Sequence, residues 1–402
     1  MIEYKIEPGD TLGKIARKFY GEAGLFTLIV SANEIANPDD LPVGETLLIP
    51  DREASAAGAQ SGPAPPYGEI ADLLKAGQVV PFLGAGVNIG QRPPQAAWAE
   101  GTVEFLPTGA ELSRFLARKS NFPSTDDHDL SDLAKVSSYF VETTARRRLR
   151  DRLREVFAIP EDRAVAQRPV VDRRGEPCSI HKYLAGIGAP LLIVTTNYDD
   201  LMERSLTKAG KPYYLVVHLT DHKAQDASVL LWEPGANKPE AIPPNELVLN
   251  LERATVVYKM HGTVNRLNKW ASYVITEEDY VDFLSRMTSY TAVPMQFMRY
   301  FRERHFLFLG YGLRDWNLRV ILKNLRDILP SNTKISSASS GEGEAETQQV
   351  EEQQDTEEEP DLRSWAIQFR PSDFERELWN ARKVKIYDQD LDEFVRRLQL
   401  SS

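Results

Sequence analysis

Four short apolar runs in this chain each end in residues that can bind a ligand or move a proton. The runs are Val79–Leu83, Leu191–Val194, Val256–Met260 and Phe306–Leu309. The residues that follow them are Gly84-Ala85-Gly86, Thr195-Thr196-Asn197-Tyr198-Asp199, His261-Gly262 and Gly310-Tyr311-Gly312. In an open α/β sheet, ligands sit where the carboxyl ends of the strands meet. We therefore expect one site that contains an asparagine, an aspartate, a histidine and two glycine turns, each able to accommodate a phosphate group.

Each of these motifs has an ordinary explanation when it is taken alone. The glycine cluster of Gly84–Gly86 and Gly90 fits backbone N–H groups that approach a phosphate, but tight turns use glycine as well. Asn197 and Asp199 could simply cap the helix expected to follow them. A lone histidine such as His261 is more often structural than catalytic.

Composition indicates a soluble globular protein. The chain has 402 residues, 42% hydrophobic and 27% charged, which is enough for two or three domains. No apolar run approaches the roughly 18 residues of a membrane-spanning helix, and no basic leader precedes an apolar stretch. The single cysteine, Cys178, cannot form an internal disulfide or a four-cysteine zinc site. We expect a cytoplasmic protein.

The formal net charge of −11 is concentrated in one tract. Ten acidic residues without any Lys or Arg lie between Glu342 and Asp361, and removing them would leave a net charge of −1. General nucleic-acid binding is therefore not expected. A basic cluster from Arg146 to Arg154 alternates with Leu149 and Leu153, which is typical of the solvated face of a helix. A surface for a phosphate or acidic partner is the alternative.

The chain divides into three parts by composition and pattern. Residues 1–50 form a small βααβ unit, and residues 51–66 are rich in Ala, Gly, Ser and Pro, as a flexible linker is. Residues 67–402 show an α/β pattern that predicts a Rossmann-like parallel sheet. Within this part we expect a helical insert at about 100–175, which could cover the site. We also expect a disordered acidic insertion at about 331–362.

The N-terminal unit resembles a LysM domain. The matching residues are Tyr4-Lys5-Ile6, Pro8-Gly9-Asp10-Thr11-Leu12, Ile15-Ala16, Asn33, Asn37–Leu41, Pro42-Val43-Gly44-Glu45 and Leu48-Ile49-Pro50. The resemblance implies binding of glycans that contain N-acetylglucosamine. For a cytoplasmic protein the alternative, an assembly or docking module that binds a protein partner, is favoured.

The order of the four strand-end motifs is similar to that of sirtuin-type NAD-binding domains. The similarity is strongest to the bacterial branch of phage-defence NADases, and it includes Leu106–Leu112, Gly310–Arg319 and Trp365–Phe369. Deacylating sirtuins carry a zinc module held by two Cys-x-x-Cys pairs, which one cysteine cannot build. They also carry Pro-Asp-Phe-Arg after the first glycine turn, where this chain has Asn88–Pro94. We therefore expect no zinc and no peptide cleft, but an NAD pocket.

The resemblance implies that this pocket cleaves the nicotinamide–ribose bond of NAD, its substrate. Asn197 would orient the ribose and the attacking water, His261 would be the general base, and Asp199 would hold the nicotinamide side or a ribose hydroxyl. The nucleotide would be bound by Gly84, Ala85, Gly86, Thr196, Gly310 and Gly312. Two alternatives stay open: an NAD-dependent deacylase or ADP-ribosyltransferase, and a non-catalytic sensor of NAD or ADP-ribose.

A constitutive NAD hydrolase would harm its own cell, so control is expected. The resemblance implies an NAD-depleting effector of antiphage defence that is held inactive until it is triggered. We expect a homo-oligomer, an activating protein or glycan-like ligand acting through the LysM-like unit, and neither a nucleic acid nor a membrane as a direct partner.

Overall fold

The computed structural model describes most of the chain, as two compact units: Met1–Ala64 and Pro65–Ser402. The described residues are 2–20, 26–33, 35, 41–50, 64–90, 92–93, 96–157, 172–220, 228–264, 272–288, 292–311, 363–369, 371–380 and 383–401. Gly312, most of the expected linker, the end of the expected helical insert and the expected acidic insertion lie outside these residues.

The first unit has the predicted order of strand, two helices and strand. Its elements are β1 (Ile2–Lys5), α1 (Leu12–Tyr20), α2 (Phe26–Asn33) and β2 (Thr46–Ile49). The two strands pair in antiparallel fashion, with Ile2 opposite Ile49. The side chain of Asn33 joins α2 to β2, because its amide exchanges hydrogen bonds with both the N–H and the C=O of Leu48. Apolar side chains of all four elements form a separate small core.

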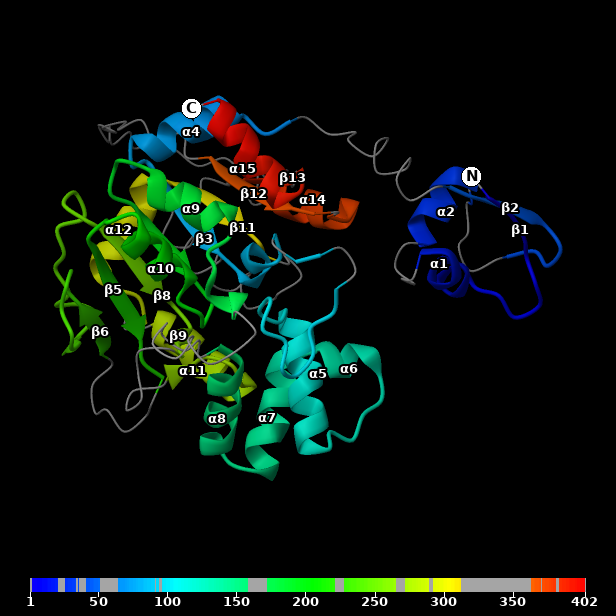
Figure 1. Ribbon diagram of the computed structural model, residues 1–402, viewed down its shortest axis with the longest axis horizontal. Helices are drawn as coiled ribbons and strands as arrows, with labels where there is room; N and C mark the ends of the chain where they lie inside the picture. Colours follow the sequence, from blue (N-terminus) through cyan, green and yellow to red (C-terminus); the bar gives the residue numbers. More distant parts are fainter. Residues whose placement is uncertain are drawn as a thin grey trace, which may run out of the picture. The chain divides into compact units, whose positions relative to one another are not determined.

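The second unit is built on a sheet of nine strands in the order β13-β12-β11-β3-β4-β8-β5-β6-β7 (Figure 1). The seven strands from β13 to β5 run parallel to their neighbours, and β6 and β7 continue the sheet in antiparallel fashion. The strands are β3 (Val79–Leu83), β4 (Leu192–Thr195), β5 (Tyr213–His218), β6 (Val229–Trp232), β7 (Glu240–Ile242), β8 (Thr255–Lys259), β11 (His305–Leu309), β12 (Ser364–Gln368) and β13 (Val384–Asp388). The predicted α/β class with a Rossmann-like parallel sheet is confirmed.

Helices cover both faces of this sheet, and the apolar runs explain why. Every residue of β3 is buried; Val80 and Phe82 point into one core, while Val79 and Leu83 point into the other. Strands of this kind need cover on both sides. The first core includes side chains of α11 (Glu277–Thr288), α12 (Met295–Glu303) and α14 (Asp373–Asn380). The second includes side chains of α4 (Tyr67–Lys75), α9 (Ser179–Gly186), α10 (Leu201–Lys208) and α15 (Leu391–Leu400).

Four helices between β3 and β4 form a group of their own beside one end of the sheet (Figure 1). They are α5 (Gly109–Ser120), α6 (Asp127–Ser131), α7 (Leu133–Thr143) and α8 (Arg146–Phe157). Their core also includes Tyr198, which follows β4, and Tyr273 of the short strand β10 (Ser272–Tyr273). Leu149 and Leu153 of α8 are buried there, and Arg147 and Arg148 beside them are exposed. The amphipathic helix predicted from the arginine cluster is therefore present.

Small elements complete the unit. They are the 3₁₀ turns η2 (Ala85–Asn88) and η4 (Arg173–Gly175) and the hairpin strands β9 (Gly262–Thr263) and β10 (Ser272–Tyr273). No helix among the described residues is long and apolar enough to cross a membrane.

Candidate functional site

A cavity of about 750 Å³ lies where the carboxyl ends of β3, β4, β8 and β11 meet. Residues that follow each of these strands line it: Ala85, Gly86, Thr196, Asn197, Asp199, His261 and Gly310. These seven are among the nine residues expected at the site. Of the other two, Gly84 is not among the lining residues, and Gly312 is outside the described residues.

Glycine residues after β3 allow the backbone there to approach the backbone at the end of β11 closely. The N–H groups of Gly84 and Gly86 donate to the carbonyls of Leu309 and Gly310, at 2.9 and 2.8 Å. A Cβ atom on Gly86 would lie 2.6 Å from the Gly310 carbonyl oxygen, and one on Gly84 would lie 2.7 Å from the same atom. Glycine is thus required here by the close approach of two backbones. The N–H groups of Gly84 and Gly86 already have partners, so their first role is to build the turn.

Asn197 connects the end of β4 to the end of β3. Its Nδ2 donates to the Gly84 carbonyl at 3.0 Å, and its backbone N–H donates to the Thr195 hydroxyl at 3.0 Å. The side chain is buried at the cavity wall. These bonds fix the amide between the two strands.

Asp199 both accepts a hydrogen bond from the start of α10 and lines the cavity. Its Oδ1 accepts the N–H of Leu201, in the first turn of α10, at 3.1 Å. Its Oδ2 accepts Nδ2 of Asn88 at 2.8 Å, while Oδ1 of Asn88 is buried without a hydrogen-bond partner. Asn88 also lines the cavity, although the sequence did not single it out as a site residue. Its position two residues after Gly86 is the feature of the sequence that could have indicated a place at the site.

His261 presents a neutral imidazole to the cavity. The residue is 4% exposed, and burial lowers the pKa of its imidazole from 6.5 to about 3. The ring makes edge contacts with Tyr280 and Phe283, with centroids 5.4 and 5.6 Å away. Its Nε2 is buried without a hydrogen-bond partner. A buried nitrogen of this kind can accept a proton from a bound molecule.

The glycine after His261 has a steric reason. Gly262 has φ +83°, and a Cβ there would lie 1.8 Å from the carbonyl oxygen of Ser272. Only glycine allows the chain to turn at this point and pair with β10. The His-Gly pair thus places a side chain that lines the cavity directly before a turn that requires glycine.

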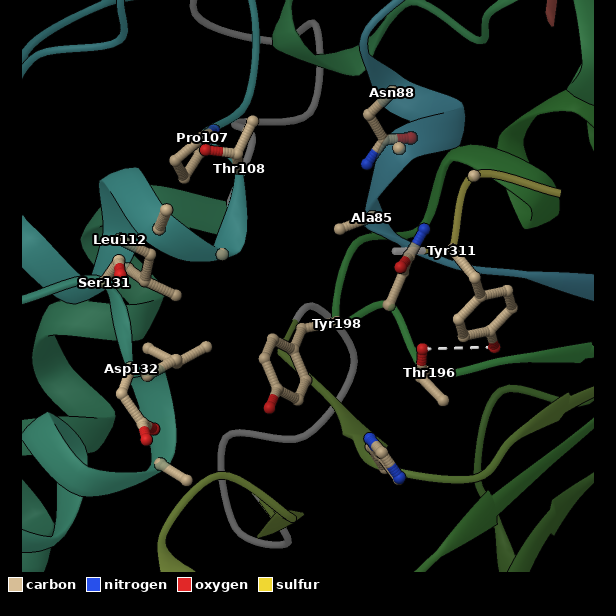
Figure 2. Close-up of a pocket in the computed structure, with 18 of the residues that line it drawn as sticks. Ala85, Asn88, Pro107, Thr108, Leu112, Ser131, Asp132, Thr196, Tyr198 and Tyr311 are labelled. Atoms are coloured by element: carbon tan, nitrogen blue, oxygen red, sulfur yellow. Dashed lines mark hydrogen bonds between the residues drawn. The ribbon is translucent and has the colours of Figure 1, made fainter. Parts of the chain in front are cut away.

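Thr196 and Tyr311 close another side of the cavity. Their hydroxyl groups lie 3.3 Å apart, and the Tyr311 hydroxyl also donates to the Leu83 carbonyl at 3.3 Å (Figure 2). Tyr311 separates the two glycines of the second turn, and sequence reasoning assigned it no role.

The helical group supplies the opposite wall. Figure 2 shows Pro107, Thr108, Leu112, Ser131 and Asp132 across the cavity from the strand ends, and all five line it. The sequence predicted that a helical insert could cover the site but did not identify these residues. Their positions depend on how the helices pack against the sheet.

A partly buried ion pair anchors that wall. Nη2 of Arg92 lies 2.7 Å from Oε2 of Glu111, and the guanidinium stacks 4.3 Å from the ring centroid of Phe105. Glu111 also accepts the N–H groups of Thr108 and Trp98. This arrangement holds the first turn of α5 against the segment that follows the glycine turn of β3.

The described residues contain no group of three or more His, Cys, Asp or Glu side chains that could hold a metal ion. Cys178, at the start of α9, is buried.

Comparison with known proteins finds a matching domain family in each part of the chain. The model of the SIR2-like domain matches residues 191–387, and that of the LysM domain matches residues 4–50. Both resemblances inferred from the sequence are thereby confirmed.

Relatives of the larger part include the NAD(+) hydrolase ThsA of Acinetobacter baumannii, 28% identical over 218 residues, which are 54% of this chain and 35% of that protein. The defense-associated sirtuin 2 of Bacillus subtilis is 21% identical over 260 residues, 65% of this chain and 20% of that protein. An esterase of Mycobacterium tuberculosis is 48% identical over 48 residues, 12% of this chain and 10% of that protein. The chain thus spans about a third of these relatives' length or less.

Proposed function

Since the chain carries a SIR2-like domain and a LysM domain, we propose that its larger unit hydrolyses NAD at the nicotinamide–ribose bond. The products are nicotinamide and ADP-ribose. One observation carries the proposal: Asn197 and His261, from two different strands, line the same cavity, where Nε2 of His261 is buried without a partner. The names of the NAD(+) hydrolase relatives support the choice of substrate.

The proposed reaction needs stabilisation of a cation and one proton acceptor. The bond between ribose C1′ and the pyridinium nitrogen breaks, and its electron pair stays on nicotinamide, which leaves a cationic ribose. A water oxygen then bonds to C1′ and loses a proton to Nε2 of His261, which passes it to solvent. Because burial lowers the pKa of His261 to about 3, this transfer needs a water that the cation has already made acidic.

Other residues of the cavity receive proposed positioning roles. Asn197 orients the nicotinamide ribose and the water, and Asp199 faces the nicotinamide side or a ribose hydroxyl. Ala85 and the turn of Gly84 and Gly86 approach the pyrophosphate. Thr196 and Gly310, with Gly312 beyond the described residues, take the adenosine half.

In the cell, we propose an NAD-depleting effector of antiphage defence that acts in the cytoplasm. The name of the Bacillus subtilis relative supports this setting. The helical wall formed by α5 to α7 controls access to the cavity, and the chain works as a homo-oligomer. The LysM domain acts as the sensing or assembly element, by docking a protein partner or a glycan-like ligand.

The test is the release of nicotinamide and ADP-ribose from NAD, followed by chromatography, with purified protein and in phage-infected cells. Asn197→Ala and His261→Ala should each reduce turnover about 100-fold or more, because each removes a group placed at the reacting ribose. Asn250→Ala and His305→Ala are the matched controls and should retain turnover, because Asn250 lies at an exposed loop position and His305 at the opposite end of the sheet.

Full turnover by the Asn197 and His261 variants would contradict these roles. The absence of NAD loss both in the purified protein and in infected cells would contradict the function itself. Loss of acetyl from an acetylated peptide, with NAD consumed in equal amount, would instead identify a deacylase.

A further inference from the structure

The ammonium of a buried lysine contacts two residues that are themselves almost fully buried, one of them at the cavity wall. Lys259 is the last residue of β8 and is 1% exposed; Glu203 of α10, beside it, is 2% exposed. Nζ of Lys259 lies 3.3 Å from Oε1 of Glu203 and donates a hydrogen bond to the backbone carbonyl of Asp199. Burying a charged pair costs several kcal/mol of desolvation free energy per ion. A pair in this position is therefore expected to have a structural or functional role.

Lys259 connects the two segments that carry the proposed site, which are the end of β8 and the loop that follows β4. In the parallel pairing of β4 and β8, Lys259 lies opposite Thr195, two residues before Asn197. Along its own strand, Lys259 precedes His261 by two residues. Its ammonium therefore crosses from the histidine strand to the loop that presents Asn197 and Asp199.

The ammonium contacts the backbone of that loop and not its side chains. Asp199 binds the ammonium through its backbone carbonyl, which leaves its carboxylate to bond Asn88 and the N–H of Leu201. Oε2 of Glu203 is buried without a hydrogen-bond partner. His181 of α9, also buried, has a pKa lowered to about 4 by burial, so its imidazole adds no positive charge at neutral pH.

We propose that Lys259 is a positioning residue, whose ammonium fixes the Asp199 carbonyl and so holds the Asn197–Asp199 loop in register with His261. This role rests on the proposed function, because it concerns how Asn197 and His261 are held in one relative geometry at the reacting ribose. Lys259 itself does not line the cavity. Its effect on a bound ribose passes through Asp199 and Asn197.

The test separates positioning from stability by comparing two variants. Lys259→Met keeps the length of the side chain and leaves Glu203 buried without its partner. In the double variant Lys259→Met with Glu203→Leu, both charges are replaced by apolar groups, which is often neutral or stabilising. Lys385→Met, an exposed lysine on β13, is the matched control.

We expect kcat for NAD to fall about 10- to 100-fold in both Lys259 variants, since a displacement of about 1 Å at a reacting group has this effect. The midpoint of urea unfolding should fall in the single variant and recover in the double variant, whereas kcat should not recover. Lys385→Met should retain the original kcat and midpoint.

Hydrogen exchange gives a readout that does not need turnover. The N–H of Leu201 donates to Asp199, so its protection should fall in both Lys259 variants if the loop is released. Unchanged protection, or an original kcat in a stably folded double variant, would overturn the proposal. No release of nicotinamide by the unsubstituted protein, both when purified and in infected cells, would refute the proposed function, and the exchange result would then still decide whether Lys259 holds the loop.

Discussion

Among single residues, burial decides the chemical state of the proposed base. A histidine with an ordinary pKa of 6.5 would be largely protonated below pH 6, but His261 has a pKa lowered to about 3 by burial. The sequence identified His261 by its place after a strand, and nothing in the sequence indicated that Tyr280 and Phe283 would enclose its ring. Its protonation state was therefore beyond sequence reasoning.

The lowered pKa predicts the pH dependence of NAD turnover. Because the group protonates only near pH 3, the neutral imidazole stays available as the pH falls from 8 to 5.5. We expect kcat/KM for NAD to change by less than about twofold over this range through His261. A decrease of about tenfold per pH unit below 6.5 would show that the base titrates normally. The His261→Ala variant, measured over the same range, supplies the background.

Among elements, the ends of β3 and β11 form the floor of the cavity by close contact between their backbones. The four apolar runs were sufficient to predict strands here, because a short buried strand has a continuous apolar pattern. The contact between Gly86 and Gly310 depends on β11 lying beside β3, although more than two hundred residues separate them in the chain. Strand order of this kind is decided by the whole sheet.

Gly86→Ala tests this contact. Its Cβ would meet the Gly310 carbonyl oxygen at 2.6 Å, so we expect a loss of about 1–3 kcal/mol in the free energy of unfolding and a reduced NAD turnover. Gly188→Ala is the matched control, because a Cβ there meets nothing within 4 Å and should change the stability by less than about 0.5 kcal/mol. Urea unfolding measures both, and equal stabilities would contradict the close contact.

For the whole molecule, the chain contains two compact units with separate cores. The core of the first unit consists of its own apolar residues, among them Ile15, Ala16, Ile29 and Ile49. All of the described residues that line the cavity belong to the second unit. Catalysis and its control are thus expected to be separable by deletion.

A chain without residues 1–64 should bind NAD as tightly as the full chain, because no cavity residue is removed. Its assembly or its activation should change if the LysM domain has the proposed role. Calorimetry measures NAD binding, light scattering measures the oligomer, and NAD loss in infected cells measures activation. Unchanged assembly and unchanged activation would rule out that role.

Sequence patterns alone were sufficient to predict the α/β class, the SIR2-like and LysM resemblances and seven of the residues that line the cavity. These follow from local patterns: apolar runs predict strands, glycines mark tight turns, and polar residues at strand ends mark the ligand edge of a parallel sheet. Three features became visible only in the folded chain: Asn88 bonds Asp199, Thr108 and Asp132 lie across the cavity from the strand ends, and Lys259 is buried against the backbone of Asp199. Each of these depends on contacts between segments far apart in the chain, and on the exclusion of water that such contacts create.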